Sequence, residues 1–259
     1  MIRIDKVEPK GKDFQVVLEE NGEKTTITVH QDVLMRHGLF RKKTLTENER
    51  REIEKENAHA KLMQKALDLL ALRDHSVASM RRKLKGLAHS EAVESTLSKL
   101  KTLGYLNDDL MLERLVDDMI GFSLKGPGAI REKALKEGFH ASDVDTALAR
   151  MDETMEKERL ERFVDKEMGR YVKDPIKKKA MKLMRLTVQN GYDMDLARSV
   201  IKKKTEAHKD TDHERGLLEK RIETLKDHYN LNDYKSTGKL IQKLMREGFD
   251  YEAIKDRLK

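Results

Sequence analysis

Lysine and arginine side chains recur in the second helical segment of three similar stretches of the chain. Cations repeated on equivalent helices can contact DNA phosphates, which fixes position without reading sequence, or acidic groups of a partner protein. The candidate binding residues are Arg81, Arg82, Lys83 and Lys85, then Lys125, Arg131, Lys133 and Lys136, then Lys178, Lys182 and Arg185. A solvated helix face uses the same residue types and accounts for any one of them alone, but the repeated placement favours binding. Arg81 and Arg82 lead the set, because two adjacent guanidiniums are less typical of surface filler than lysines.

The residues offer no comparable arrangement for catalysis or for a metal. The chain has no Cys, which excludes disulfides, thiolate nucleophiles and Cys-ligated zinc. A Gly-rich phosphate loop of the P-loop type is also missing. The densest group of metal-ligand types is His208, Asp210, Asp212 and His213, in the polar stretch 202–212 that we expect to form a flexible joint. We therefore expect a protein that is not an enzyme and holds no metal and no cofactor.

One phrase recurs four times along the chain: an amphipathic basic helix, a glycine, and a second short amphipathic helix. The marker glycines are Gly86, Gly138, Gly191 and Gly248, which lie 52, 53 and 57 residues apart. A fixed period of this size indicates a tandem array of one supersecondary unit. Each unit of such an array contacts mainly its neighbours. We expect an elongated, curved array with an extended surface, which favours a binding protein over an enzyme.

Apolar positions at helical spacing predict three helices in each unit, as in the stripe Met63, Ala66, Leu67 and Leu70. Several polar and glycine residues fit structural roles at the helix ends, as caps, stops and turns. They are Arg73, Ser76, Gly104, Asn107, Asp108, Gly126, Gly138, Gly191 and Gly248. Within this set, we expect Ser76 to cap the helix after it and Arg73 to bond the terminal carbonyls of its own helix.

Aromatic residues follow the glycine stops at Tyr105, Phe139, Tyr192 and Phe249. They could stack on the bases of a single strand. Their periodic placement favours a hydrophobic plug that closes each bundle.

The first thirty residues follow a different pattern. Apolar residues alternate with polar ones around Ile2–Val7, Phe14–Leu18 and Ile27–Val29, and period two predicts strands. Asn21-Gly22 favours a type I′ hairpin between the second and third strands. Three strands are marginal alone, so the sheet should lean on a helix near 32–37. Thr46 and Glu49 then form a capping box that opens a charged helix leading into the array.

The predicted organisation has five parts. Residues 1–45 form the β element with its short helix, and residues 46–106 form the first repeat with a lead-in helix. Residues 107–151, 152–206 and 207–259 form the second, third and fourth three-helix repeats. The fold class is thus mostly α, with a small N-terminal antiparallel β element.

Composition fits a helical protein with charged exposed faces. Of 259 residues, 39% are charged and only 5% are aromatic, and the net charge of +7 allows association with a polyanion. The excess is modest, since 54 basic residues are offset by 47 acidic ones. No apolar run approaches the ~20 residues that cross a bilayer, and the N-terminus has no signal-peptide pattern. We expect a cytoplasmic protein with no membrane partner.

Several stretches resemble the RecX family. The segment Ala66–Leu84, ALDLLALRDHSVASMRRKL, resembles the first motif of these proteins. Gly104–Asp108 (GYLND), Gly126–Ile130 (GPGAI) and Gly138-Phe139 resemble later ones, in the family's order and spacing. The N-terminal strands resemble the extension of the longer Gram-positive members. The chain departs at Ser79-Met80, where Glu-Leu is usual, and at Glu137, where Lys is common.

The resemblance implies a regulator of the RecA recombinase, in DNA repair and the SOS response. Such a protein binds the RecA–single-stranded-DNA filament, lies in its groove and inhibits ATP hydrolysis and strand exchange. We expect it to act as a monomer, with weak and non-specific contact to single-stranded DNA. Two other classes stay open: a non-sequence-specific nucleic-acid-binding helical protein without a RecA target, and a scaffold for other partners.

Overall fold

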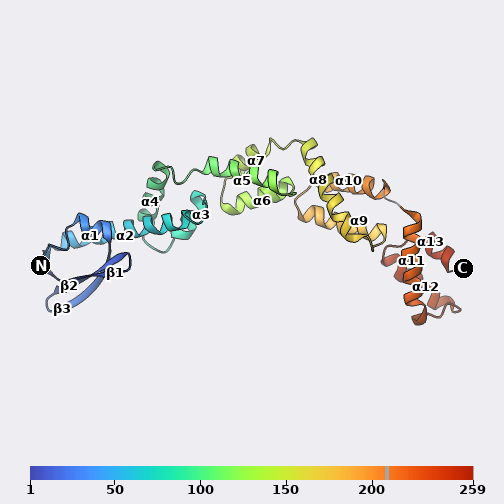
Figure 1. The fold of residues 1–259 in the computed structure, drawn as a ribbon, viewed down its shortest axis with the longest axis horizontal. Helices are drawn as coiled ribbons and strands as arrows, with labels where there is room; N and C mark the ends of the chain where they lie inside the picture. Colours follow the sequence, from blue (N-terminus) through green and yellow to red (C-terminus); the bar gives the residue numbers. More distant parts are fainter. Residues whose placement is uncertain (208–209, 259) are drawn as a thin grey trace. The chain divides into compact units, whose positions relative to one another are not determined.

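The computed structural model describes residues 1–207 and 210–258, and these are predominantly helical (Figure 1). They form two compact units. The first is Met1–Met111 with Glu137–Phe139, and the second is Leu112–Lys136 with the residues from His140 onward. The predicted class, mostly α with a small antiparallel sheet at the N-terminus, is confirmed.

The first unit begins with an antiparallel sheet of strand order β3-β2-β1-β4. Its strands are β1 (Ile2–Lys10), β2 (Asp13–Glu20), β3 (Glu23–His30) and β4 (Thr44–Leu45). The predicted hairpin is confirmed, because Asn21 and Gly22 both have positive φ, at 50° and 84°. Strand β4 was not predicted, because a two-residue strand shows no alternation. It pairs with β1 through Ile2 and Leu45.

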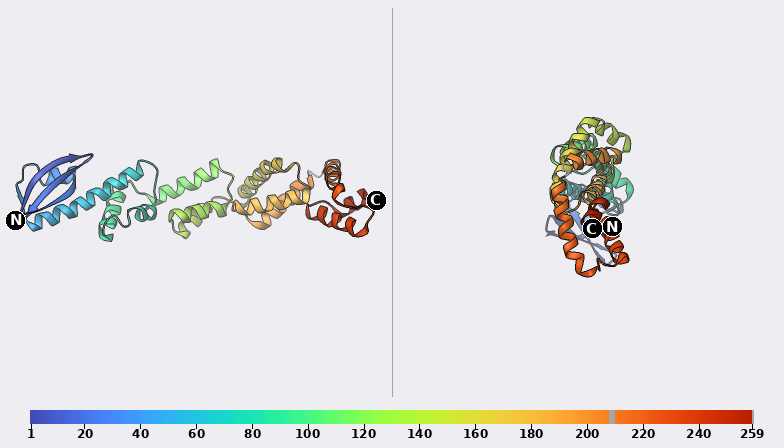
Figure 2. Two further views of the ribbon diagram at one scale, coloured as in Figure 1. Left: turned by 90° about the horizontal axis from the view of Figure 1, so that it is seen from below. Right: turned by 90° about the vertical axis from the view of Figure 1, so that its right-hand side faces the viewer.

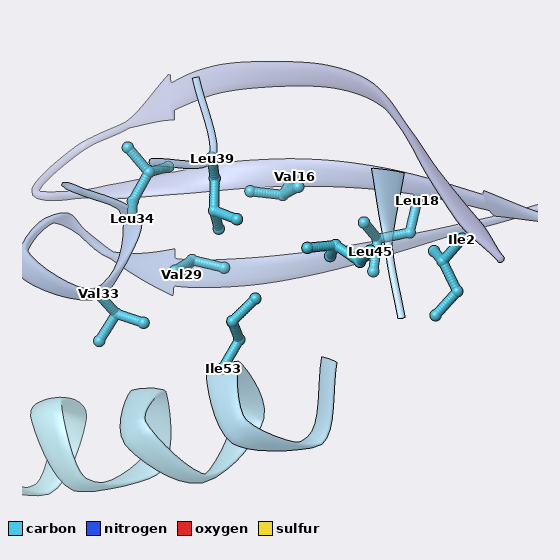
Figure 3. Close-up of a cluster of buried hydrophobic side chains, with 9 residues drawn as sticks. All are labelled: Ile2, Val16, Leu18, Val29, Val33, Leu34, Leu39, Leu45 and Ile53. Atoms are coloured by element: carbon cyan, nitrogen blue, oxygen red, sulfur yellow. The ribbon is translucent and has the colours of Figure 1, made fainter. Parts of the chain in front are cut away.

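One face of this sheet is buried by helices, as Figure 3 shows. Helix α1 (Gln31–Arg36) supplies Val33 and Leu34, as expected from the sequence. Helix α2 (Glu47–Leu70) adds Ile53, which points towards Val29 of β3. The sheet therefore rests on two helices, which add the apolar burial that so few strands lack alone.

Helix α2 differs from the prediction, which placed a lead-in helix before the three helices of the first repeat. The Thr46–Glu49 capping box is present, with Thr46 Oγ1 accepting from Glu49 N at 3.2 Å. The helix then runs without a break for 24 residues from the sheet into the first repeat (Figure 2). Ile53 packs in the sheet core, whereas Leu62 and Ala66 pack with the next two helices. No residue between these two faces stops the helix, so one element serves two cores.

The remaining helices follow in groups of three. Helices α3 (Val77–Leu84) and α4 (Ser90–Thr102) pack on α2. Next come α5 (Asp108–Phe122), α6 (Pro127–Glu137) and α7 (Ala141–Leu148), then α8 (Glu153–Met168), α9 (Ile176–Gln189) and α10 (Met194–Ala207). The last group is α11 (Thr211–Leu225), α12 (Tyr234–Arg246) and α13 (Tyr251–Arg257). Short 3-10 turns follow α8 at Gly169–Tyr171 and α11 at Lys226–His228.

The predicted flexible joint at 202–212 is wrong for most of its length. Helix α10 continues to Ala207, and α11 begins at Thr211 after an N-cap at Asp210. Val200 and Ile201 are buried on the inner face of α10, and the helix continues beyond them although Lys202, Lys203 and Glu206 are exposed. His208 and Lys209 lie outside the described residues.

Buried clusters lie in the sheet and in the first, third and fourth helix groups. Separate cores gather around Leu62–Leu106, Leu160–Ile201 and Leu218–Ile254, beyond the sheet core. The five-part division at 45, 106, 151 and 206 remains a prediction. Within the described chain, no helix combines the length and apolar character that a bilayer crossing requires.

Candidate basic interface on the second helices

Helix α3 carries the first group of candidate residues. Arg81 forms a two-pronged ion pair with Glu94 of α4: Nε lies 2.6 Å from Oε1 and Nη2 lies 2.9 Å from Oε2. The hydrogen bond from Arg81 lowers the pKa of the Glu94 carboxyl. Arg82 Nη2 donates to the Glu137 carbonyl at 3.4 Å. Lys83 and Lys85 are exposed. The leading sequence candidates thus have partners inside the protein, and the two lysines point to solvent.

Helix α6 repeats this arrangement. Arg131 pairs with Asp145 of α7, with Nε 2.7 Å from Oδ1 and Nη2 3.2 Å from Oδ2. Arg81 and Arg131 are each the fifth residue of their helix, and Glu94 and Asp145 are each the fifth residue of the next one. The first two helix groups therefore share this pair at equivalent positions, whereas the corresponding residues of the third group are Ala180 and Arg198. The ion pair braces the second helix against the third, although both ends are exposed enough for a contribution of only about 0.2–1 kcal/mol.

Of the other candidates near α6, two bond to residues of the protein and one is exposed to solvent. Lys125 Nζ donates to Asn190 Oδ1 at 2.7 Å and is half-buried. Lys136 lies 2.6 Å from Glu132 along the helix. Lys133 is exposed.

Two of the three candidates on α9, Lys178 and Lys182, form ion pairs with Asp174, which precedes the helix. Its carboxylate lies 3.0 Å from Lys178 Nζ and 2.5 Å from Lys182 Nζ. Partial burial would raise the pKa of Asp174, but hydrogen bonds from Lys182 and Lys178 bring it below its ordinary value. Lys182 also lies 4.8 Å from the Tyr171 ring centroid. Arg185 is exposed, as are Lys83, Lys85 and Lys133.

The structural residues near α3 form a junction. Ser76 caps α3 as predicted, accepting from Ser79 N at 3.0 Å, and its hydroxyl donates to the Glu137 carbonyl at 2.5 Å. Asp108 Oδ1 accepts from Val77 N at 2.8 Å, and so caps α3 as well. Asn107 caps α5 through Leu110 N at 3.0 Å.

Arg73 does not bond the carbonyls of its own helix, as the sequence suggested. It lies 3.4 Å from the Glu137 carboxylate. The Glu137 side chain, placed where the family commonly has Lys, attracts the guanidinium away from the helix end.

Three of the four marker glycines also make close inter-helix contacts. Gly138, Gly191 and Gly248 have φ of +100°, +81° and +100°, which only glycine adopts without strain. A Cβ on them would lie 2.5 Å from Ala78 Cβ, 2.0 Å from Ala129 N and 2.9 Å from Lys178 N, respectively. Each contacted residue lies in the first turn of the second helix of the preceding group. Gly86 has similar φ but nothing within 4 Å, and it has no preceding group.

The Gly191 contact explains the GPG motif. Gly126 N donates to the Asn190 carbonyl at 2.8 Å, and Gly128 N donates to the Gly191 carbonyl at 2.9 Å. A Cβ on Gly126 would lie 2.5 Å from Gly191 O. Two backbone segments therefore meet directly, which only glycine on both sides permits.

Arg159 on α8 is the principal residue that sequence reasoning missed. It is 2% exposed, and Nη2 donates to the carbonyls of Met119, Ser123 and Lys125 at 3.2, 2.7 and 3.1 Å. Nη1 donates to the Ile120 carbonyl, while Nε has no partner among the described atoms. The side chain thus binds the carbonyls that end α5, a favourable place for a cation. The sequence signal that could have indicated its burial is its position four residues before Phe163, on the apolar face of the same helix.

The aromatic plugs are confirmed at three of four positions. Phe139, Tyr192 and Phe249 are buried, and the Tyr192 hydroxyl donates to the Leu124 carbonyl at 2.9 Å. Burial raises the pKa of Tyr192 to about 12. Tyr105 is wrong as a plug: it is 54% exposed, because it follows the stop of a third helix and not a second.

Asp210 and His213, from the densest group of metal-ligand residue types, form local hydrogen bonds. Asp210 Oδ1 accepts from the amides of Asp212 and His213, both at 3.0 Å, and so caps α11. His213 Nε2 lies 2.9 Å from the Val172 carbonyl. His208 is outside the described residues.

Fold and junctions define a helical-repeat protein with an N-terminal sheet. No family model matches the chain. Curated relatives named regulatory protein RecX resemble it over nearly its full length. One from Listeria monocytogenes is 28% identical, across 97% of this chain and 93% of the relative. One from Limosilactobacillus reuteri is 26% identical, across 100% and 98%.

Two crystal structures of RecX proteins resemble the fold of this chain. A crystal structure of regulatory protein RecX has a TM-score of 0.56 at 25% identity, covering 77% of this chain and 98% of that one. RecX from Lactobacillus salivarius shares the fold, with a TM-score of 0.50 at 24% identity over 56% of this chain and 96% of that one. The predicted resemblance to the RecX family is confirmed, because the chain is similar to these regulatory proteins in sequence and in fold.

Proposed function

We propose that this protein regulates RecA: it binds the RecA–single-stranded-DNA filament in the cytoplasm and inhibits ATP hydrolysis and strand exchange without catalysis of its own. The observation that carries the proposal is the near full-length similarity to proteins named regulatory protein RecX. The protein would act as a monomer that lies in the filament groove. Several weak contacts made together by one chain raise the overall affinity through effective concentration.

The internal partners of the candidate cations suggest how the contacts would be shared among them. Arg81, Arg131, Lys136, Lys178 and Lys182 have carboxylate partners inside the protein, Lys125 has an amide partner, and Arg82 has a carbonyl partner. A new partner would have to compete with these bonds. The exposed Lys83, Lys85, Lys133 and Arg185 carry no such cost, so we assign them the larger share of binding to acidic groove residues or phosphates.

The same exposed cations favour a second candidate function, non-sequence-specific nucleic-acid binding without a RecA target. Such binding would weaken steeply with salt and would not depend on RecA. A salt titration on single-stranded DNA, with and without RecA, separates the two.

The deciding experiment measures RecA ATP turnover on single-stranded DNA. We expect substoichiometric amounts of the protein to slow turnover. If an excess leaves turnover unchanged while the protein still coats the DNA, the second candidate function replaces the first.

A further inference from the structure

A pocket of about 380 Å³ lies within the second unit, between the segment that leads into α9, one face of α11 and the turn after α12. Four of the residues that line it are cations: Lys173, Lys178, Lys220 and Arg221. Two are carboxylates, Asp174 and Glu247, so four cations against two anions leave the lining with a net charge of +2. A cavity of this size can enclose one small ligand group, and the excess of positive charge favours an anion.

Both carboxylates of the lining are already paired inside the protein. Asp174 lies 3.0 Å from Lys178 Nζ and 2.5 Å from Lys182 Nζ. Glu247 accepts from both prongs of Arg221, with Nε and Nη2 each 2.6 Å from a carboxylate oxygen. These bonds lower the pKa of Glu247, so its carboxylate stays ionised and paired. Neither carboxylate is left to neutralise a further cation.

Lys173 and Lys220 are the cations of the lining that have no carboxylate partner among the described residues. Both are exposed. Lys173 precedes α9, in the third helix group, whereas Lys220 lies on α11, in the fourth. The two free cations therefore border the pocket from two different walls.

The type of these free cations favours phosphate over carboxylate. A carboxylate is matched best by the planar fork of an arginine, and the one arginine in the lining already holds Glu247 with that fork. Lysines bind phosphate as compact point charges. A nucleic-acid strand offers a phosphate at every nucleotide, and contacts to it carry no sequence information. The pocket thus suits a backbone phosphate better than an acidic peptide.

We propose that this pocket binds a phosphate group of a single-stranded nucleic acid, held between Lys173 and Lys220. The bound strand joins the third helix group to the fourth, because each group supplies one of the two lysines. The site is separate from the cations of α3 and α6. It deepens the proposed function, and rests on it for the source of the strand, the single-stranded DNA of the filament.

The test uses the full chain without RecA and follows a fluorescein-labelled oligo-dT by fluorescence anisotropy. Lys173→Glu with Lys220→Glu should weaken binding about tenfold. The slope of log affinity against log salt should become shallower by about 0.7, the value for one phosphate of a single strand. Lys10→Glu with Lys12→Glu, an equal charge change on the hairpin, should bind as the parent does. Lys173→Gln with Lys220→Gln removes the charge without reversing it and should give the same change of slope.

Two further ligands identify the occupant. Inorganic phosphate and a Glu-rich octapeptide are titrated into the parent and into the Lys173→Glu, Lys220→Glu variant by calorimetry at constant ionic strength. Peptide binding that needs the two lysines, with oligo-dT binding unchanged in the variant, would assign the pocket to a protein partner. The same pattern for inorganic phosphate would mean that free phosphate occupies it. Either result overturns the proposal.

An unchanged affinity for oligo-dT in both double variants also overturns the proposal, as does an absence of saturable binding by the parent. Circular dichroism confirms that the variants are folded, as expected for exposed positions. The proposed function is judged separately, by RecA turnover with the parent protein. If the parent slows turnover while the variants bind oligo-dT normally, only the pocket is wrongly assigned. If oligo-dT binding needs the lysines but the parent leaves turnover unchanged, only the proposed function fails.

Discussion

The backbone of Gly191 lies against Ala129 so closely that a Cβ on Gly191 would be 2.0 Å from the Ala129 nitrogen. The turn after α9 is thereby fixed to the first turn of α6, with Gly128 N donating to the Gly191 carbonyl at 2.9 Å. Gly138 makes the corresponding contact with Ala78 of α3, and Gly248 with Lys178 of α9. A residue type that ends a helix also joins one repeat to the preceding one.

Gly191→Ala should separate α9 from α6. A left-handed alanine costs about 1–2 kcal/mol, and the collision with Ala129 adds about 1–3 kcal/mol more. Gly86→Ala is the matched control, because Gly86 has a φ of +87° and open space around it. Hydrogen exchange should show faster exchange in α6 and α9 for Gly191→Ala only. Equal effects of the two changes would mean that close packing at Gly191 adds nothing.

Arg159→Met should destabilise the second unit by about 2–4 kcal/mol, because it leaves buried carbonyls at the end of α5 without donors. Arg162→Met on the exposed side of the same helix should stay within about 0.5 kcal/mol. Thermal unfolding followed by circular dichroism compares the two. Similar melting temperatures would show that water replaces the guanidinium at no cost.

Tyr192 should titrate later than an ordinary tyrosine, because burial raises its pKa from 10.0 to about 12. The unfolded chain releases this proton first. The contribution of Tyr192 to stability is therefore complete below pH 10.0 and is lost as pH rises towards about 12. The absorbance at 295 nm of the parent minus that of Tyr192→Phe isolates this group. A midpoint near 10 in the difference would contradict the burial.

Lys83→Glu with Lys85→Glu should raise the concentration that half-inhibits RecA at least about fivefold, since two exposed cations would become repulsive towards an acidic groove or phosphates. Lys10→Glu with Lys12→Glu carries the same charge change and should inhibit as the parent does.

The exchange Arg81→Glu with Glu94→Arg tests the paired arginine separately. It restores the ion pair in reverse, so inhibition should persist if Arg81 is mainly a brace between α3 and α4. Loss of inhibition in this variant alone would return Arg81 to the binding surface.

The repeat, the hairpin and the helix caps could be predicted because each depends on neighbours in sequence. The Asn21-Gly22 turn needs two residues with positive φ, and the Thr46–Glu49 box closes within one turn. The continuity of α2 could not be predicted, because its two apolar faces belong to different cores. Tyr105 shows the same limit: its burial depended on which helix precedes it.

The sequence by itself determined the helical class, the period of the glycines and the RecX resemblance, since these follow from residue type and spacing. Only the tertiary structure decided the partners of the charges. Glu94 and Asp145 come within hydrogen-bonding distance of Arg81 and Arg131 when the third helix folds back on the second. Arg159 binds the carbonyl of Ile120 near the end of α5, although the two residues are 39 positions apart in the sequence. Ion pairing and burial depend on distance in space, which residue order alone does not fix.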